Sequence, residues 1–222
     1  MIWTLMLAHL VADYPLQPDS LVAAKKHLPG LSIHIAIHWV MMTLLTWPVR
    51  AILWPFVLTI ALMHFGIDYF KVFLGRKRPQ WVIGPYLLDQ PLHWISLILV
   101  GIWMAQTTSL PVWDVLAPWW VYSIGLLIST YIWFVTERVL DYRDKDLQAR
   151  VKESMWPRMG VRLLLYLLLV AAQPLTLLLV LPALGFIAYL YGRYHYPRRW
   201  LIIDLGVALA GALMVLVILA LW

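Results

Sequence analysis

The chain lacks cysteine altogether and has few charged residues. None of its 222 residues is Cys, which excludes disulfides, thiolate metal ligands, iron–sulfur clusters and thiol nucleophiles. Only 13% of the residues are charged, whereas 63% are hydrophobic, and the mean hydropathy is +0.80. Long apolar runs recur along the whole chain. This composition predicts an all-α, polytopic transmembrane helical bundle.

Several familiar sequence signatures are also missing. There is no GxxxxGK(S/T) phosphate loop, no GxSxG nucleophile elbow and no HExxH pair. The first apolar segment has neither a basic flank nor a small-residue cleavage site, so we expect it to belong to the mature fold. Ser96 could act as a nucleophile, although a serine in a membrane helix more often bonds its own backbone.

The apolar runs predict seven or eight membrane segments, which lie near residues 1–14, 32–47, 51–73, 89–106, 116–137, 161–181, 183–192 and 200–221. Pro174 and Pro182 leave open whether the stretch 161–192 crosses once, crosses twice or is re-entrant. We expect two parts, a four-helix core over 1–110 and a C-terminal part over 111–222. Within the second part, the stretch 138–160 mixes basic residues with apolar residues at helical spacing, which predicts an interfacial amphipathic helix on the cytoplasmic side.

The positive charge lies between the predicted spans. A formal charge of +6 would suggest nucleic-acid binding in a soluble protein, but here it more readily sets topology and contacts anionic lipid head groups. We therefore expect no nucleic-acid partner. One side of the membrane would receive Lys25, Lys26, Lys71, Arg76, Lys77, Arg78, the basic stretch from Arg138 to Arg162, Arg193, Arg198 and Arg199. By the positive-inside rule this side is cytoplasmic, and the N-terminus is outside.

Four of the predicted spans each carry a pair of polar residues in i,i+4 spacing. The pairs are His9 with Asp13, His34 with His38, His64 with Asp68, and Asp89 with His93. This spacing puts both side chains of a pair on one helix face, about one turn apart. Because the spans alternate in direction, all eight residues fall at the cytoplasmic ends of their helices. Spacing and topology thus predict one common layer.

Five imidazoles and three carboxylates facing inward from four helices are the ingredients of a metal site. Eight ligands exceed what one tetrahedral ion needs, so we expect two divalent ions that share a bridging Asp. Histidine with aspartate suits Zn, Mn or Fe(II) without choosing among them. Gln17, Lys71 and Gln90 are candidates to orient ligands or to contact an anionic substrate. Lys71 could instead pair with Asp68, three residues earlier.

Each pair also has a purely structural interpretation. Asp89 stands two residues before Pro91 and could cap a helix N-terminus. His9 with Asp13 could form a buried ion pair. Purely structural roles would require four unrelated coincidences at one spacing and one depth, and each unpaired buried polar group would cost several kcal/mol. Taken together, the four pairs therefore favour the metal site. His27 and His195 lie among basic residues, and we interpret them as surface groups.

These motifs resemble those of a family of bacterial multispanning proteins of unknown function. The runs AHLVADYPLQ, HIAIH, ALMHFGIDYFK and LLDQPLHWISL are similar to that family's HxxxDYxLQ, HxxxH, HxxxD and DQxxH motifs, in the same order, over roughly residues 5–100. The resemblance implies a multi-pass protein of the bacterial inner membrane, and loose relatives are membrane-bound metal-dependent hydrolases. In the second half TERVLDYRD is similar to a Leu-Glu-Arg segment of the family, with Glu137 and Arg138 as an acid–base pair.

The leading functional hypothesis is metal-assisted hydrolysis of an amphiphilic substrate, such as a lipid or isoprenoid phosphate, from the inner leaflet. Asp13 or Asp68 would be the general base for a water activated by the metal. Three other classes stay open: a di-iron oxidase, a metal or proton transporter, and a non-catalytic subunit of a larger membrane complex that binds metal, haem or pigment. Whether the protein is an enzyme, and whether it binds other membrane proteins or itself, is also open.

Overall fold

The computed structural model of the protein describes residues 1–110, 117–171 and 178–221. It is 86% helix and has no strand in these residues, which confirms the predicted all-α class. The chain divides into two compact units, Met1–Trp120 and Val121–Trp222.

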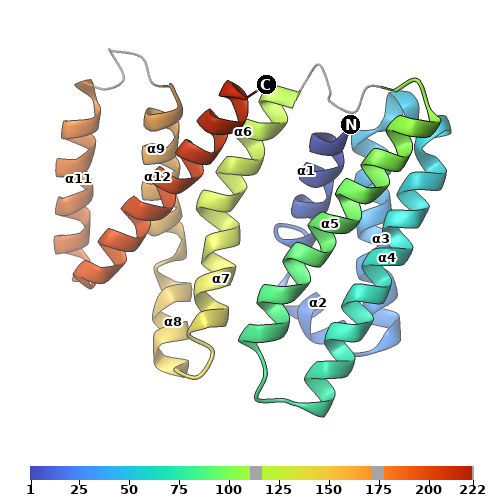
Figure 1. Ribbon diagram of the computed structural model, residues 1–222. Helices are drawn as coiled ribbons and strands as arrows, with labels where there is room; N and C mark the ends of the chain where they lie inside the picture. Colours follow the sequence, from blue (N-terminus) through green and yellow to red (C-terminus); the bar gives the residue numbers. More distant parts are fainter. Residues whose placement is uncertain (111–116, 172–177, 222) are drawn as a thin grey trace. The chain divides into compact units, whose positions relative to one another are not determined.

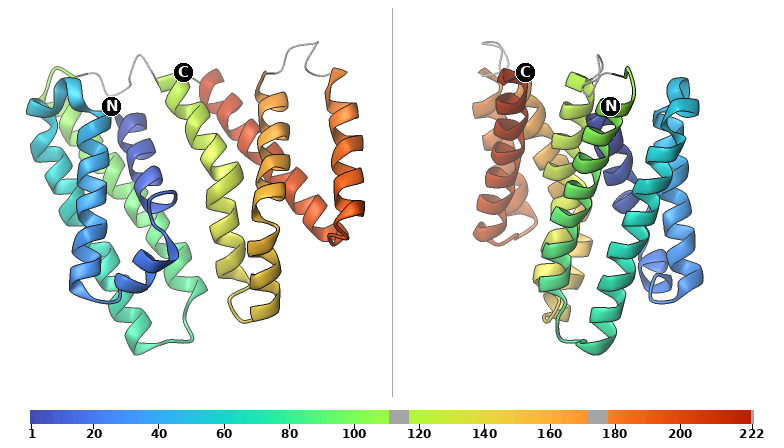
Figure 2. Two further views of the ribbon diagram at one scale, coloured as in Figure 1. Left: turned by 180° about the vertical axis from the view of Figure 1, so that it is seen from behind. Right: turned by 45° about the vertical axis from the view of Figure 1, so that its right-hand side comes forward.

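The N-terminal unit is a bundle of helices joined by short connections (Figures 1 and 2). Its elements are α1 (Ile2–Asp13), α2 (Asp19–Ala24), α3 (Leu28–Leu45), the short 3-10 helix η1 (Trp47–Val49), α4 (Arg50–Lys77) and α5 (Ile83–Thr107). α1 packs against α3 and α5, and α4 packs against α3 and α5. The C-terminal ends of α1 and α4 and the N-terminal ends of α3 and α5 lie toward the same end of the bundle, at the bottom of Figure 1.

Large apolar side chains cover the outside of this unit as well as its interior. Leu5, Leu53 and Met104 are buried, while Trp54 and Leu62 on the outer face of α4 are 61% and 63% exposed. An extended apolar surface of this kind is unfavourable in water and suits contact with lipid. The arrangement therefore indicates a membrane protein.

Five helices among the described residues are long and apolar enough to cross a membrane: Leu28–Leu45, Trp47–Lys77, Ile83–Thr107, Ala117–Leu140 and Arg198–Ala220. Lys145–Glu153 and Met155–Ala171 make a sixth candidate that is bent by 60°. Ile2–Asp13 and Val180–Arg193 are apolar but shorter. A helix of 12 residues such as α1 is about 18 Å long, whereas the hydrocarbon core is about 30 Å thick. Length and composition thus support five or six spans where the sequence predicted seven or eight segments.

The helix boundaries differ from the predicted ones in a consistent way. The predicted spans 32–47, 51–73 and 89–106 became the longer helices α3, α4 and α5. Pro29 lies in the first turn of α3, where the missing N–H breaks no helical bond. Arg76 and Lys77 occupy the last turn of α4, where positive charge favours the helix dipole. Apolar runs alone mark the lipid-facing part of a helix and miss these polar turns.

The elements after residue 116 are α6 (Ala117–Leu127), the π-helical segment η2 (Ile128–Ile132), α7 (Trp133–Leu140), α8 (Lys145–Glu153), α9 (Met155–Ala171), α11 (Val180–Arg193) and α12 (Arg198–Ala220). α9 packs against α12, α11 and η2. The stretch 161–192 contains most of α9 and of α11, and the part of its prediction that falls on 172–177 lies outside the described residues.

The predicted amphipathic helix over 138–160 is wrong in its extent. This stretch contains the end of α7, all of α8 and the start of α9. The Asp144 carboxylate starts a new helix by accepting a hydrogen bond from the Leu147 backbone N–H at 2.8 Å. Leu147 and Val151 lie one turn apart on α8 and are buried in the core of the C-terminal unit. The apolar face of α8 therefore packs on protein.

Candidate metal centre

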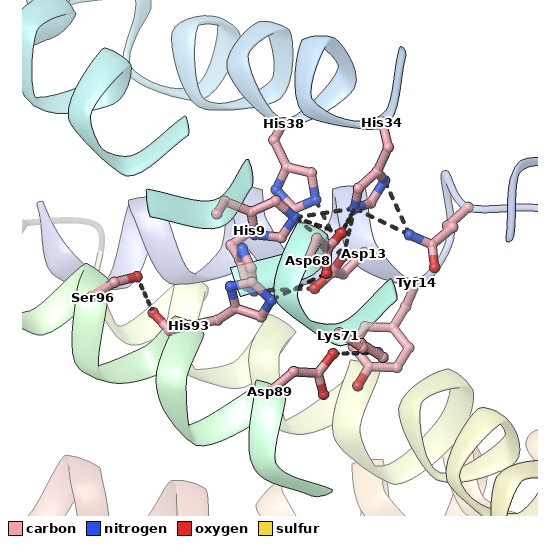
Figure 3. Close-up of polar contacts among 12 residues, drawn as sticks. His9, Asp13, Tyr14, His34, His38, Asp68, Lys71, Asp89, His93 and Ser96 are labelled. Carbon is pink, nitrogen blue, oxygen red and sulfur yellow. Dashed lines mark hydrogen bonds and ion pairs between the residues drawn. The ribbon is translucent and has the colours of Figure 1, made fainter. Parts of the chain in front are cut away.

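The four polar pairs predicted from the sequence meet inside the N-terminal bundle (Figure 3). The eight side chains are His9 and Asp13 on α1, His34 and His38 on α3, His64 and Asp68 on α4, and Asp89 and His93 on α5. Seven of them are buried, and the Asp13 side chain is 8% exposed. The structure thus brings all eight predicted ligands together.

Asp13 is the meeting point of four imidazoles. Its carboxylate oxygens lie near the Nε2 atoms of His34 at 3.1 Å, His9 at 3.2 Å, His38 at 3.2 Å and His64 at 3.9 Å. The i,i+4 spacing accounts for the contact with His9 only. The other three rings come from α3 and α4, so the packing of helices completes this group.

Asp68, on α4, is a second meeting point. Its carboxylate oxygens lie near the Nε2 atoms of His34 at 3.3 Å, His64 at 3.6 Å and His93 at 3.6 Å, and near the Lys25 Nζ at 2.6 Å. His34 and His64 face both carboxylates, and their own Nε2 atoms are 3.1 Å apart. These two rings link the Asp13 and Asp68 groups into one continuous cluster.

The three residues predicted to surround the ligands, Gln17, Lys71 and Gln90, differ in what they contact. The Gln17 side-chain amide lies 3.0 Å from the Nδ1 and 3.2 Å from the Nε2 of His34, so it contacts that imidazole directly and can orient it. The Lys71 ammonium forms an ion pair with Asp89 on α5, so the predicted pairing with Asp68 on its own helix is wrong. Gln90 is half-buried, and among the described residues it makes no polar contact with the eight ligands.

Lys25 is a member of the cluster that sequence reasoning assigned to topology and lipid contact only. It follows α2 directly, and its side chain is 12% exposed with the ammonium against Asp68. Nothing in its local sequence marks this role, because the neighbouring Lys26 has the same chemistry. The turn that brings α2 across the end of the bundle selects Lys25.

A helix boundary decides the interpretation of Asp89, and a hydrogen bond decides that of Ser96. Because α5 begins at Ile83, Asp89 lies inside the helix, and its predicted role as an N-terminal cap is wrong. The Ser96 hydroxyl donates to the His93 carbonyl at 2.7 Å, which confirms that it bonds its own backbone. Ser96 is therefore no nucleophile in this arrangement.

The geometry of the cluster suits a bound cation. Three groups have ligand atoms within 4.8 Å of one another: His9, Asp13, His38 and His64; His34, His64 and Asp68; and Asp68, Asp89 and His93. Ligand atoms around a tetrahedral ion are separated by about 3.3 Å when each bond is about 2.0 Å long. The closest ring nitrogens lie 3.1 to 3.2 Å from the Asp13 carboxylate. These buried groups could hold a metal ion.

Several ring nitrogens in the cluster have no hydrogen-bond partner among the described residues. They are the Nδ1 atoms of His9, His38, His64 and His93, together with the Nε2 atoms of His9 and His93, which lie 3.2 and 3.6 Å from carboxylate oxygens without hydrogen-bond geometry. A buried polar atom without a partner costs about 1–3 kcal/mol. An ion that took up the lone pairs of these rings would remove part of this cost, so the donor set fits a metal.

A second buried polar cluster lies in the C-terminal unit. The Arg158 guanidinium donates to both Asp204 and Glu137 at 2.8 to 3.0 Å, and Arg162 donates to Asp204 at 2.6 Å. The Tyr191 hydroxyl also donates to Asp204. All of these side chains are buried. Glu137, the acidic residue of the family-like segment, is therefore paired with Arg158 on α9.

Sequence reasoning missed this cluster because Arg158 and Arg162 were assigned to a basic cytoplasmic stretch. One signal was available in Asp204, the single acidic residue of a 23-residue apolar helix. A charge inside an apolar span almost always has a partner. The i,i+4 spacing of Arg158 and Arg162 marks the helix face on which that partner would be found.

The chain belongs to the family described as "Protein of unknown function (DUF3307)", whose model matches residues 1–121. This match confirms the resemblance to an uncharacterised family and includes all eight cluster residues. The segment around Glu137 lies outside the matched residues. No curated protein and no solved structure matches the chain.

Proposed function

We propose that this member of a family of unknown function is an integral membrane hydrolase that depends on divalent metal. Its substrate would be an amphiphile with a phosphate-bearing head group, such as a lipid or isoprenoid phosphate, taken from the cytoplasmic leaflet of the bacterial inner membrane. The observation that carries the proposal is the convergence of eight buried histidine and aspartate side chains from four helices. Intramembrane ionisable residues are rare and usually functional.

The chain's own residues have distinct places in such a reaction. A divalent ion held at the cluster would supply an activated water and a positive charge beside the substrate. Asp13 is surrounded by imidazoles and would be a ligand. Asp68 would accept the proton of the water as its oxygen bonds to phosphorus and the P–O ester bond breaks. The departing alkoxide then takes that proton, which returns Asp68 to its starting state.

A cavity beside the cluster suits an amphiphilic substrate. It has a volume of about 460 Å³ and is lined by basic residues and by apolar residues of α2, α4 and the start of α5. Lys26, Lys71 and Arg76 supply the positive charge, and Val22 and Val82 are among the apolar lining residues. Lys71 also contacts Asp89, so it connects the cavity to the candidate metal centre. A phosphate head group and the first part of its chain would both find matching surroundings there.

The proposed topology has seven or eight membrane segments, counting the shorter helices α1 and α11 with the longer ones. The basic residues Arg76, Lys77 and Arg78 follow the cluster at the end of α4. By the positive-inside rule this end of the bundle is cytoplasmic, and the N-terminus is outside. The substrate would then reach the cluster from the inner leaflet.

Ring spacing favours an ion over haem or another planar pigment at the cluster. The imidazoles of His9, His38, His64 and His93 lie with centroids 3.9 to 5.1 Å apart. A macrocycle would have to lie between the two imidazoles that ligate it, whereas these rings pack directly against one another. A transporter that moves metal or protons uses similar residues, and uptake into proteoliposomes would distinguish it from a hydrolase.

Metal content of the purified protein tests the proposal. Elemental analysis of the full-length protein in detergent should find at least one Zn, Mn or Fe ion per chain. We expect His38→Ala, which removes a ring from the Asp13 group, to lower the metal content at least tenfold at limiting free metal. His27→Ala is the matched control, because His27 is exposed and lies outside the cluster. A protein that holds no metal above background, or loses it equally in both variants, contradicts the proposal.

Hydrolysis of lipid phosphoesters by the metal-loaded protein is the corresponding activity test. Replacing a general base typically lowers the rate 10²- to 10⁴-fold. We therefore expect Asp68→Asn to lower the rate by about that factor while at least one ion stays bound through the Asp13 group. Metal binding without any hydrolysis, together with uptake in proteoliposomes, would favour the transporter.

A further inference from the structure

Two of the three ligand groups in the candidate metal centre have no residue in common, and the third group, His34, His64 and Asp68, links them. We call His9, Asp13, His38 and His64 the first subsite, and Asp68, Asp89 and His93 the second subsite. Each has its ligand atoms within 4.8 Å of one another. His34 lies between them, at 3.1 Å from Asp13 and 3.3 Å from Asp68.

Both lysines of the cluster contact the second subsite. The Lys25 ammonium lies 2.6 Å from an Asp68 oxygen, and the Lys71 ammonium forms an ion pair with Asp89. The Asp13 carboxylate of the first subsite is instead contacted by imidazoles. Each carboxylate of the second subsite therefore already has a cation beside it, whereas the Asp13 carboxylate of the first subsite is surrounded by imidazoles.

We propose, on the basis of the metal binding inferred above, that the two ammonium groups stand in for a second metal ion. The resting protein then holds one divalent ion, in the first subsite. The second subsite accepts an ion only when an anionic phosphate group draws Lys25 and Lys71 away from Asp68 and Asp89. Binding of the substrate head group would thus complete the metal centre.

The charges of the cluster support this order of events. Three carboxylates and two ammonium groups leave one net negative charge when the imidazoles are neutral. One divalent ion turns this into one positive charge, whereas two ions would give three positive charges in a buried site. Such an excess is costly away from water. A phosphate dianion lowers the total to one positive charge again, so the second ion and the phosphate stabilise each other.

The two lysines also line the cavities from which a phosphate would approach. Lys71 lines the 460 Å³ cavity, and its side chain is 33% exposed while that of Asp89 is 5% exposed. Lys25 lines an adjoining cavity of about 110 Å³. Lys26 and Arg76 line both cavities. Each ammonium can therefore turn from its carboxylate toward a phosphate without crossing the apolar core.

Metal stoichiometry of the full-length protein in detergent tests this proposal without an activity assay. At saturating Mn²⁺ we expect one ion per chain, and two after addition of inorganic phosphate or of micelles of a short-chain phosphatidic acid. Micelles of phosphatidylcholine, which has no phosphate monoester, should leave the value at one. A response to phosphatidic acid but not to inorganic phosphate would assign the effect to a lipid head group.

Lysine variants provide the second arm of the test. Lys25→Met with Lys71→Met should bind two ions per chain without phosphate, because the carboxylates of the second subsite are then free. Lys71→Met alone, which removes the more exposed lysine, should raise the affinity for the second ion at least tenfold. Lys26→Met is the matched control for charge, because Lys26 is exposed and directly follows Lys25; it should stay at one ion in the absence of phosphate.

Three outcomes would overturn the proposal. Two ions in the wild-type protein without phosphate would mean that the lysines do not exclude the second ion. If the wild-type protein with phosphate and the double lysine variant both bind only one ion, the second subsite is no metal site. An unfolding temperature of the double variant equal to that of the wild type would show that the variant is folded. No bound ion under any condition would refute the proposed function itself, which separates that failure from failure of the lysine hypothesis.

Discussion

Asp204 is the carboxylate at which the buried polar cluster of the C-terminal unit converges. It accepts hydrogen bonds from Arg158, Arg162 and Tyr191, and it is completely buried. Asp204→Asn removes the charge and leaves two arginines with only Glu137 to compensate them. Loss of one partner in a buried ion pair costs about 3–5 kcal/mol. We expect a corresponding loss of unfolding free energy, measured by denaturant or thermal unfolding in detergent.

Two further variants test whether the loss of stability is specific to Asp204. Glu137→Gln should cost less than Asp204→Asn, because Arg158 keeps its two bonds to Asp204 when the Glu137 charge is removed. Asp146→Asn, on the exposed side of α8, should change stability by no more than about 0.5 kcal/mol. If Glu137→Gln proves the more damaging substitution, Asp204 is not the centre of the cluster.

At the scale of elements, α2 decides which lysine reaches the metal centre. A Cβ added at Gly30, in the first turn of α3, would lie 2.2 Å from the Ala24 carbonyl oxygen at the end of α2. Only glycine permits this close approach, which holds Lys25 against Asp68. Gly30→Ala should force the end of α2 away from α3 at a cost of about 1–3 kcal/mol. The resulting loss of the Lys25 contact should raise affinity for a second Mn²⁺ ion in the metal assay.

Gly66→Ala is the matched control on α4. Gly66 lies two residues from both His64 and Asp68, and a Cβ there would meet nothing within 4 Å. Alanine is the better helix former by about 1 kcal/mol, so this variant should be neutral or slightly stabilising. Equal effects of the two substitutions would mean that the contact between α2 and α3 does not position Lys25.

At the scale of the whole molecule, the absence of cysteine makes the membrane topology directly measurable. A single engineered cysteine is the only thiol in the chain. We expect Ser109→Cys, in the exposed turn after α5, to react with a membrane-impermeant maleimide in cells whose outer membrane has been permeabilised. Lys77→Cys, at the opposite end of the bundle, should react only after the inner membrane is disrupted. The reversed pattern would place the metal centre at the outer leaflet and contradict a cytoplasmic substrate.

Helical spacing made much of the candidate site predictable. His9 with Asp13 and His64 with Asp68 are polar pairs in otherwise apolar runs, and the 3.6-residue period places each pair on one face. The partners of Lys25 and Arg158 were not predictable in this way. Arg158 and Asp204 are 46 residues apart, and such pairing depends on how the helices pack and not on any local pattern.

The sequence by itself determined the helical class, the membrane character and the residues that can bind metal, because all three follow from local composition and periodicity. The tertiary structure alone decided which charges meet. It placed Lys25 and Lys71 on Asp68 and Asp89, and it buried Arg158 with Asp204. The reason is that a buried charge must find an opposite charge wherever packing brings one within reach, and that distance is a property of the assembled helices.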